Sequence, residues 1–312
     1  MLLLRRVGQV LFVIWLAFTL SFILLNVLPG DAVLAKLGGV DANRQITEAE
    51  LAAIRAQVGL DGPLVTQYLQ RLGGVVTLNL GHSLQTREPV LDMLVTALPP
   101  TLQLAAAGFL LAIAFGGLLG ATAAYTRTPW LRTALLAFGT IGTAVPAFWI
   151  GISLITLFSF WLPLFPASGT AGPSSLVLPA ITLAIMPASL VTQVFYESLA
   201  RAMSEPFATT AVMKGASRMR VLVRHGIRNA AVPVVTLAGV VAGYLLVGSV
   251  VVETVFSRAG IGYLTVNAVR TVDLSVISGL VVFSAVVFVT LNLLVDLACP
   301  FIDPRMRAGM TS

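Results

Sequence analysis

Residues 93–126 read MLVTALPPTLQLAAAGFLLAIAFGGLLGATAAYT, a stretch without Asp, Glu, Lys or Arg. A helix that crosses a bilayer needs about 20 consecutive apolar residues, so this stretch predicts a membrane-spanning helix. Four more such stretches lie at 7–30, 133–196, 229–252 and 274–295. The chain is 57% hydrophobic and 10% charged, whereas soluble domains carry about 25% charged residues. Lipid is therefore the expected solvent, and the net charge of +6 is not taken to indicate a nucleic-acid partner.

The number and direction of the spans follow from these stretches. The stretch 133–196 is too long for one span and is broken by Pro, Gly and Ser between 163 and 174. The prediction is therefore an all-α polytopic membrane protein with six transmembrane helices, near 9–28, 99–124, 134–160, 176–198, 232–252 and 275–296. Cytoplasmic loops are enriched in Lys and Arg. With both termini in the cytoplasm, the inner segments hold twelve of the 19 basic residues.

The first 97 residues combine a predicted span with a long outer segment. Residues 1–30 are interpreted as an uncleaved first span, because a cleaved signal has a shorter apolar region and a small-residue cleavage site. The segment 31–97 is too long for a connector and predicts a small helical extracytoplasmic cap. Thr47 and Glu50 form a capping box for one cap helix, and Pro63 and Gly73 suit the start and stop of another. One face of that second helix would carry Leu64, Tyr68, Leu69 and Leu72. The cap could be a packed surface or a docking platform for an external partner.

The loop 201–232 is the least membrane-like part of the later chain, with six Lys or Arg residues. Pro206 fits a helix start and Gly215 a helix stop, which predicts a short helix over about 206–214. Ser217 can cap a second helix. On that helix Arg220, Arg224 and Arg228 would share one face, either as positive-inside charge beside anionic lipid or with a further role. A short helix that projects from a membrane domain is a suitable lever for another protein.

Ten short motifs run in order along nearly the whole chain. They are LPGD (28–31), NLGHS (79–83), LPPTLQL (98–104), PAFW (146–149), LPA (178–180), MKG (213–215), RHGIRN (224–229), ETVFS (253–257), GIG (260–262) and DPRMR (303–307). In order and spacing they resemble the first permease subunit of the dipeptide, oligopeptide and nickel ABC importers. Several positions depart from the family pattern, among them Met213, where Ala usually precedes Lys214, and residues 191–194, where relatives usually carry Arg. Thr209 stands where the loop motif usually has Glu, and Ala259 where Pro usually precedes Gly260.

The resemblance implies a type I ABC importer permease fold, with a core at 98–297 that includes the coupling loop 201–232, and a cytoplasmic tail at 298–312. The short helix of the loop would be a coupling helix seated on a cytoplasmic ATPase. Its implied contact residues are Glu205, Pro206, Phe207, Thr210, Ala211, Met213, Lys214 and Gly215. The chain would form half of a translocation pathway for short peptides in a bacterial inner membrane. Its partners would be a second homologous permease subunit, two ATPase subunits and an extracytoplasmic substrate-binding protein.

The chain itself is not expected to be an enzyme or to hold a cofactor. It has no G-x-x-x-x-G-K-[ST] phosphate loop, so ATP would be bound by the partner ATPases. The motifs of zinc proteases and serine hydrolases are also absent from the sequence. His82 and His225 are predicted on opposite sides of the membrane, so no metal site is expected.

Few polar side chains lie at membrane depth, and Gln103, Gln193 and Asn292 are the candidates for lining the pathway. Gln103 could instead bond across helices. Ionisable residues deep in a membrane mark proton relays, and their scarcity argues against a proton-coupled carrier. A secondary transporter is kept as a distant alternative. Within the resembling family, import of nickel chelates, opines or oligosaccharides is the alternative to peptide import.

Overall fold

A computed structural model gives the structure of residues 2–26 and 63–302, and within them the only β-pairing is an isolated bridge between His82 and Pro89. The predicted all-α class is therefore confirmed for this part of the chain. Three helices are long and apolar enough to cross a membrane: α5 (Val90–Tyr125), α8 (Ser174–Ser204) and the Thr236–Val255 part of α11 (Ile227–Val255). A bent pair, α6 and α7, makes a fourth if it is one span. The helices α1 (Leu2–Asn26) and α13 (Leu274–Ile302) overlap the two remaining predicted spans, but their apolar stretches in the described residues, Gly8–Leu24 and Leu274–Thr290, are shorter than a span.

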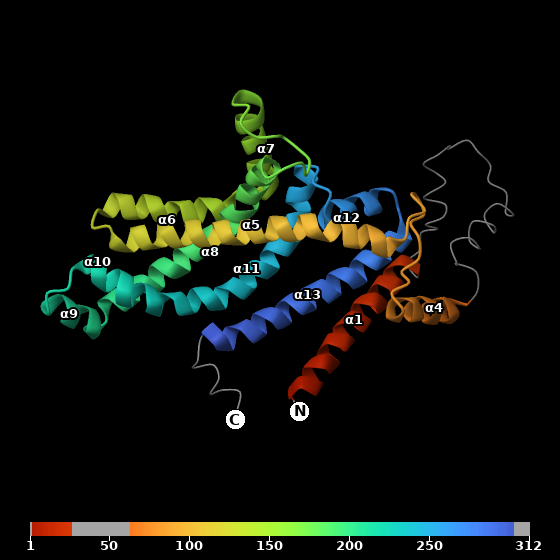
Figure 1. Cartoon of the computed structure of the whole chain (residues 1–312), viewed down its shortest axis with the longest axis horizontal. Helices are drawn as coiled ribbons and strands as arrows, with labels where there is room; N and C mark the ends of the chain where they lie inside the picture. Colours follow the sequence, from red (N-terminus) through yellow and green to blue (C-terminus); the bar gives the residue numbers. More distant parts are fainter. Residues whose placement is uncertain (1, 27–62, 303–312) are drawn as a thin grey trace. The chain divides into compact units, whose positions relative to one another are not determined.

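The chain divides into two compact units, which are described one at a time. The first comprises Met1–Pro99 and Tyr263–Thr290, and it contains α1, α4 (Leu64–Val76), most of α12 (Ile261–Arg270) and most of α13. The second comprises Pro100–Gly262 and Leu291–Ser312. Its helices are most of α5, then α6 (Pro129–Ala144), α7 (Ala147–Ile155), α8, α9 (Pro206–Met213), α10 (Arg218–Val221) and α11 (Figure 1).

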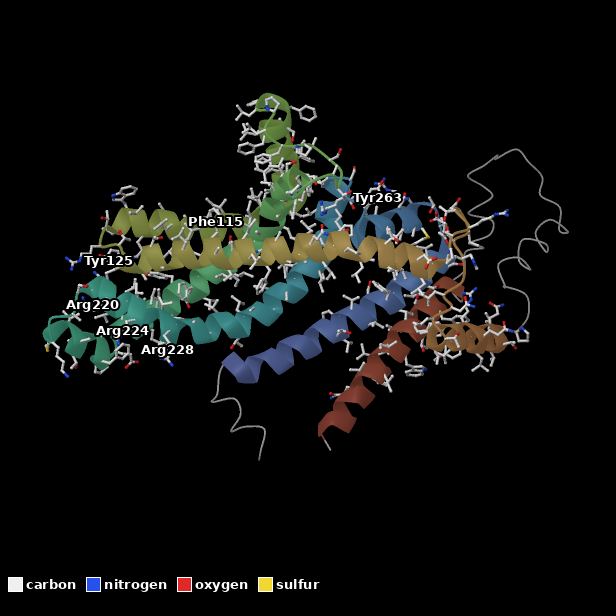
Figure 2. The ribbon with its side chains drawn as sticks, in the orientation of Figure 1. Phe115, Tyr125, Arg220, Arg224, Arg228 and Tyr263 are labelled. Atoms are coloured by element: carbon white, nitrogen blue, oxygen red, sulfur yellow. The ribbon has the colours of Figure 1, made fainter. Side chains whose placement is uncertain are left out.

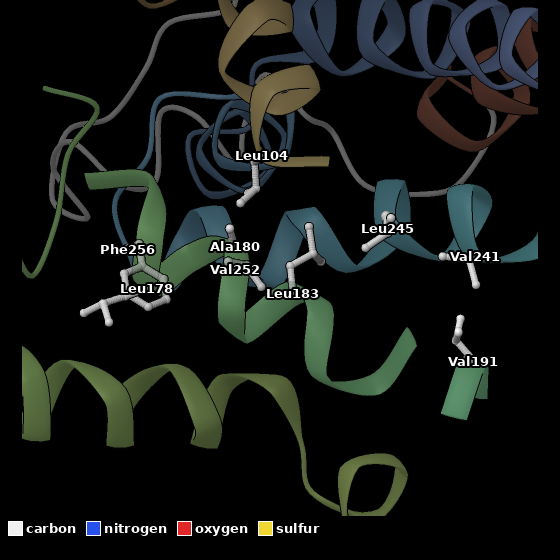
Figure 3. Packing of buried hydrophobic residues seen from close by; sticks show 9 residues of the cluster. All are labelled: Leu104, Leu178, Ala180, Leu183, Val191, Val241, Leu245, Val252 and Phe256. Atoms are coloured by element: carbon white, nitrogen blue, oxygen red, sulfur yellow. The ribbon is translucent and has the colours of Figure 1, made fainter. Parts of the chain in front are cut away.

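The core of the second unit forms where α8 packs against α5 and α11. Figure 3 shows its buried apolar residues, which come from all three helices and the residue that follows α11. They are Leu104, Leu178, Ala180, Leu183, Val191, Val241, Leu245, Val252 and Phe256. Because α8 contributes to the contact with each neighbour, it is the central helix of this unit.

Two glycines allow α5 to approach α8 closely. A Cβ at Gly116 would lie 2.6 Å from the carbonyl oxygen of Ala188, and a Cβ at Gly120 would lie 2.9 Å from that of Thr192. Their four-residue spacing is the G-x-x-x-G pattern that permits backbone contact between membrane helices. The pair therefore serves helix packing.

The third predicted span is not one straight helix, which corrects the expectation for 134–160. The helices α6 and α7 meet at an angle of 105°, and α7 continues as a π-helical segment, Thr156–Trp161. The break lies at Val145, which is extended (φ −91°, ψ 126°) directly before Pro146. Proline disfavours the helical conformation of the residue before it and has no N–H to continue the ladder. The PAFW motif therefore marks the bend.

In the first unit, α4 packs on α1 and extends beyond its predicted end. Tyr68 is 2.9 Å from the hydroxyl of Thr19 and its ring lies against Phe22, while Gln67 is buried. Of the four residues predicted to share one face, Leu64 and Leu69 are exposed. The capping box of the first cap helix lies outside the described residues.

The end of α4 is closed beyond Gly73, the predicted stop. The N–H of Asn79 donates to the carbonyl of Gly74 at 2.8 Å, and the N–H of Leu78 donates to that of Val75 at 3.3 Å. This is a Schellman closure, which needs a left-handed residue. Here that residue is Leu78, with φ 58°. Gly73 keeps a negative φ and continues the helix, so the glycine was the wrong marker for the stop.

Candidate functional site

The short helix predicted in the 201–232 loop is present as α9 (Pro206–Met213). Glu205 precedes it in an extended conformation (ψ 151°), and Pro206 occupies the first turn. Ala208 is buried at 2% exposure, whereas Met213 is 82% exposed, Val212 49% and Phe207 38%. The helix thus packs through a small residue and presents larger apolar side chains on its surface.

Gly215 ends this helix as predicted. The N–H of Gly215 donates to the carbonyl of Val212 at 2.9 Å, and the N–H of Ala216 donates to that of Ala211 at 3.1 Å. Gly215 is left-handed, with φ +86°, which is the conformation that this closure requires and that glycine adopts at least cost. Lys214 occupies the preceding position and is exposed. The sequence boundaries of α9 are therefore fixed by Pro206 and Gly215.

The three arginines that follow α9, at 220, 224 and 228, lie on a less regular helix than expected. Ser217 caps α10 by accepting from the N–H of Arg220 at 3.3 Å, as predicted. A π-helical segment, Leu222–Gly226, then interrupts the helix, so a four-residue spacing no longer keeps side chains in one α-helical row. All three are nevertheless exposed, at the end of the unit that holds α9 and α10 (Figures 1 and 2).

A buried carboxylate lies in the same unit, in the last turn of α11. The Glu253 side chain has no solvent exposure and accepts hydrogen bonds from Thr101 Oγ1 at 2.6 Å and from the N–H of Gly262 at 2.7 Å. Thr101 Oγ1 in turn accepts from the N–H of Ile261 at 2.8 Å. A Cβ at Gly260 would overlap the carboxylate. The ETVFS and GIG motifs thus meet at one hydrogen-bonded site.

A buried arginine lies next to this carboxylate. Arg258 is 2% exposed, and its Nη2 donates to Gln103 Oε1 at 3.3 Å. Its backbone N–H donates to the carbonyl of Glu253 at 2.8 Å. Burial lowers the pKa of the Arg258 guanidinium, and the Glu253 carboxylate raises it again. The net shift of the Arg258 pKa is downward, so burial outweighs the attraction to Glu253.

The first unit holds a second buried carboxylate, Asp273. It accepts from Ser83 Oγ at 2.6 Å and from the N–H of Leu84 at 3.0 Å. Its other oxygen accepts from the N–H of Val276 at 3.3 Å, which caps α13. The sequence patterns did not predict the contacts of either acid. The available signals were Glu253 directly after a charge-free stretch and Ser83 inside a motif.

The three predicted pathway residues are not brought into one network in the described part of the chain. Gln103 bonds to Arg258, as above. Gln193 of α8 is half-buried, and its Nε2 would lie 3.0 Å from a Cβ at Gly139 of α6. The side chain of Asn292 lies outside the described residues. Within the same part, no three His, Cys, Asp or Glu side chains come together as metal ligands.

Apolar helices of spanning length and a short surface helix between two of them define a polytopic membrane protein. The chain belongs to the family of binding-protein-dependent transport system inner membrane components, which it matches over residues 116–308. The N-terminal region of that family matches residues 1–105. The chain is thus a multi-pass, non-catalytic subunit of such a transport system, and the family resemblance noted in the sequence is confirmed.

Curated relatives match the chain over nearly its full length. A peptide transport system permease protein of Brucella abortus (strain 2308) is 35% identical over 314 residues, 98% of this chain and 98% of the relative. A peptide permease protein of Brucella suis biovar 1 is 37% identical over 299 residues, 92% and 93% of the two chains. The glutathione transport system permease protein of Escherichia coli O6:H1 is 34% identical over 294 residues, 94% of each.

Proposed function

We propose that this chain is the permease subunit of an ATP-driven importer for short peptides and that α9 is the helix through which a cytoplasmic ATPase drives it. The observation that carries the coupling role is the surface of α9. Its apolar side chains Phe207, Val212 and Met213 are exposed at the end of a membrane domain, on a helix with a fixed start and stop.

Such a surface suits a groove on a protein partner. Aromatic residues and Met are enriched in the cores of protein interfaces, and an amphipathic helix that lies in an apolar groove is a recurring mode of recognition. The helix also has the rigidity that a lever needs, because Pro206 and Gly215 set its ends. The remaining proposed contacts, Glu205, Thr210, Ala211 and Lys214, flank the exposed apolar residues.

The peptide substrate is inferred from the relatives, which carry peptide or glutathione transport in their names. The assembly would contain a second homologous permease, two ATPase subunits and an external substrate-binding protein. The six-span topology with both termini in the cytoplasm belongs to the same proposal, as do the extracytoplasmic cap at 31–97, the permease core at 98–297 and the tail at 298–312. Gln103 and Gln193 would act in helix packing beside the pathway.

The coupling role is tested by a charge placed on the most exposed apolar residue of α9. Met213→Asp in the full transport complex should reduce ATPase co-purification at least tenfold, which corresponds to about 1.4 kcal/mol. ATP-dependent uptake of a labelled dipeptide into proteoliposomes should fall in parallel. Met213→Leu keeps an apolar side chain and serves as the matched control, and Arg224→Asp controls for added negative charge nearby.

The outcomes separate coupling from substrate choice. A Met213→Asp complex that retains its ATPase and full uptake would overturn the assignment of α9. The substrate is tested in the unmodified complex by competition of labelled dipeptide uptake with glutathione, a nickel chelate and an oligosaccharide. Competition by the nickel chelate or the sugar alone would transfer the substrate assignment to that class and leave the coupling role intact.

A further inference from the structure

A groove of about 580 Å³ lies in the second unit where α5 ends, α6 begins and α10 passes beside them. Figure 1 shows these three segments at the same end of the unit, and Tyr125 is labelled there in Figure 2. We call it the α5–α10 groove. None of the functional residues discussed above lines it, so it is a separate feature of the molecule.

The groove is apolar over most of its length and cationic at one part of its lining. Leu118, Leu135 and Ile227 belong to its apolar walls, and Arg127 and Arg218 also line it. The charge-free stretch 93–126 ends directly before Arg127. The groove therefore extends from lipid-facing residues to the first charges beyond them, which is the boundary where phospholipid headgroups lie.

The cations at this boundary lack counter-charges among the described residues. No Asp or Glu lines the groove. Arg127 is exposed, and the Arg218 guanidinium lies 5.9 Å from the centre of the Tyr125 ring. Nearby, Arg132 donates through Nη2 to the carbonyl of Thr126 at 3.1 Å, while its buried Nε has no partner in the described part of the chain. Several fixed positive charges are thus gathered beside an apolar channel.

We propose that the α5–α10 groove binds an anionic phospholipid, with the phosphate between Arg127 and Arg218 and an acyl chain along the apolar walls. Arginine suits phosphate because its planar guanidinium can donate two hydrogen bonds at once. Basic pockets between membrane helices on the cytoplasmic side favour anionic headgroups. Tyr125 stands near the end of the charge-free stretch, two residues before Arg127, and aromatic side chains are enriched at membrane interfaces. A free phosphate would use only the cationic part and leave the apolar walls uncovered.

The proposed lipid would also affect the loop that carries α9. Arg218 and Met219 of α10 line the groove, and α10 follows α9 directly after Gly215 and Ser217. A lipid that contacts both α5 and α10 would hold the loop against the membrane domain. Coupling through α9 would then be more efficient in membranes that contain anionic lipid.

The test measures lipid retention by the purified full chain or its complex with native mass spectrometry, during titration with phosphatidylglycerol or phosphatidylcholine. The unmodified protein should retain phosphatidylglycerol at least tenfold more strongly. Arg127→Gln together with Arg218→Gln should abolish the preference. The matched control, Arg220→Gln with Arg224→Gln, removes the same charge outside the groove and should keep it. Thr122→Trp, at an exposed position that lines the groove, should reduce retention without any change of charge.

Each other outcome overturns the proposal. Equal retention of both lipids, or equal loss in the control pair, would mean unspecific attraction to the loop. Displacement of phosphatidylglycerol by millimolar inorganic phosphate would mean a simple anion site. Full retention in Thr122→Trp, in a variant that stays monodisperse, would place the lipid elsewhere. Loss of the ATPase with unchanged lipid retention in the Arg127 and Arg218 variant would make the groove a protein interface.

Discussion

Replacement of Glu253 by Ala tests whether its buried carboxylate holds the end of α11 to the start of α12. The change removes two charge-assisted hydrogen bonds, from Thr101 and Gly262, each of which contributes about 1.5–3 kcal/mol. It also removes the nearby charge that favours the ionised form of Arg258. These effects overlap, so we expect a net loss of roughly 3–6 kcal/mol.

Glu253→Gln separates charge from hydrogen bonding at the same position. The amide oxygen can still accept from Gly262, and its nitrogen can donate to Thr101 Oγ1, so the loss should be smaller, about 1–3 kcal/mol. Thr101→Ser keeps the hydroxyl that bridges Glu253 and Ile261 and should be nearly neutral. Thr101→Val removes it and should not add fully to Glu253→Ala, because both changes break the same bond.

The assay is thermal unfolding of the purified chain in mild detergent. The quantity measured is the fraction of protein that remains monodisperse at each temperature. At about 2–4 °C per kcal/mol, Glu253→Ala should lower the midpoint by roughly 6–24 °C. Glu197→Ala is the control, because Glu197 is an exposed carboxylate on α8 and its loss should be within about 0.5 kcal/mol. A Glu253→Ala midpoint within about 2 °C of the unmodified chain would refute the stabilising role.

Three further predictions follow from single contacts. Gly116→Val should destabilise the chain by about 1–3 kcal/mol through overpacking against the backbone of Ala188, and the same unfolding assay checks it. Asp273→Ala should lower the unfolding midpoint more than Ser83→Ala, because Asp273 also caps α13; equal effects would contradict this ranking. Leu78→Gly should raise the free energy of unfolding by up to about 1 kcal/mol, and with it the midpoint, since Leu78 is left-handed with φ 58°; a lower midpoint would contradict this.

Local features of the fold could be predicted from the sequence because they depend on neighbours along the chain. The length of the charge-free stretch 93–126 predicted α5, since a bilayer sets how many apolar residues a span needs. The Pro, Gly and Ser residues between 163 and 174 separated α8 from the helices before it. Pro206 and Gly215 located α9 to within one residue, since each acts through its own backbone conformation. Ser217 was found for the same reason, because an N-cap bonds within its own first turn.

The buried networks could not be predicted in this way because their partners are far apart along the chain. Thr101 and Glu253 are separated by 152 residues and Ser83 and Asp273 by 190, so their pairing depends on which helices are neighbours. The bend at Pro146 was missed for a related reason. Proline breaks some membrane helices and only kinks others, and the surrounding helices decide the angle.

The two buried acids share a chemistry that explains why an apolar chain keeps them. The first N–H groups of a helix have no partner within the helix, and its N-terminus carries a partial positive charge. Glu253 accepts from Gly262 in the first turn of α12, and Asp273 accepts from Val276 in the first turn of α13. In an apolar environment an unpaired N–H costs several kcal/mol, so a carboxylate at each of these ends stabilises the fold. An ionisable residue near membrane depth usually indicates a proton relay, but here both carboxylates are occupied by hydroxyl and backbone donors. Their position therefore favours a structural role, which agrees with a pathway driven by a partner's ATP rather than by protons.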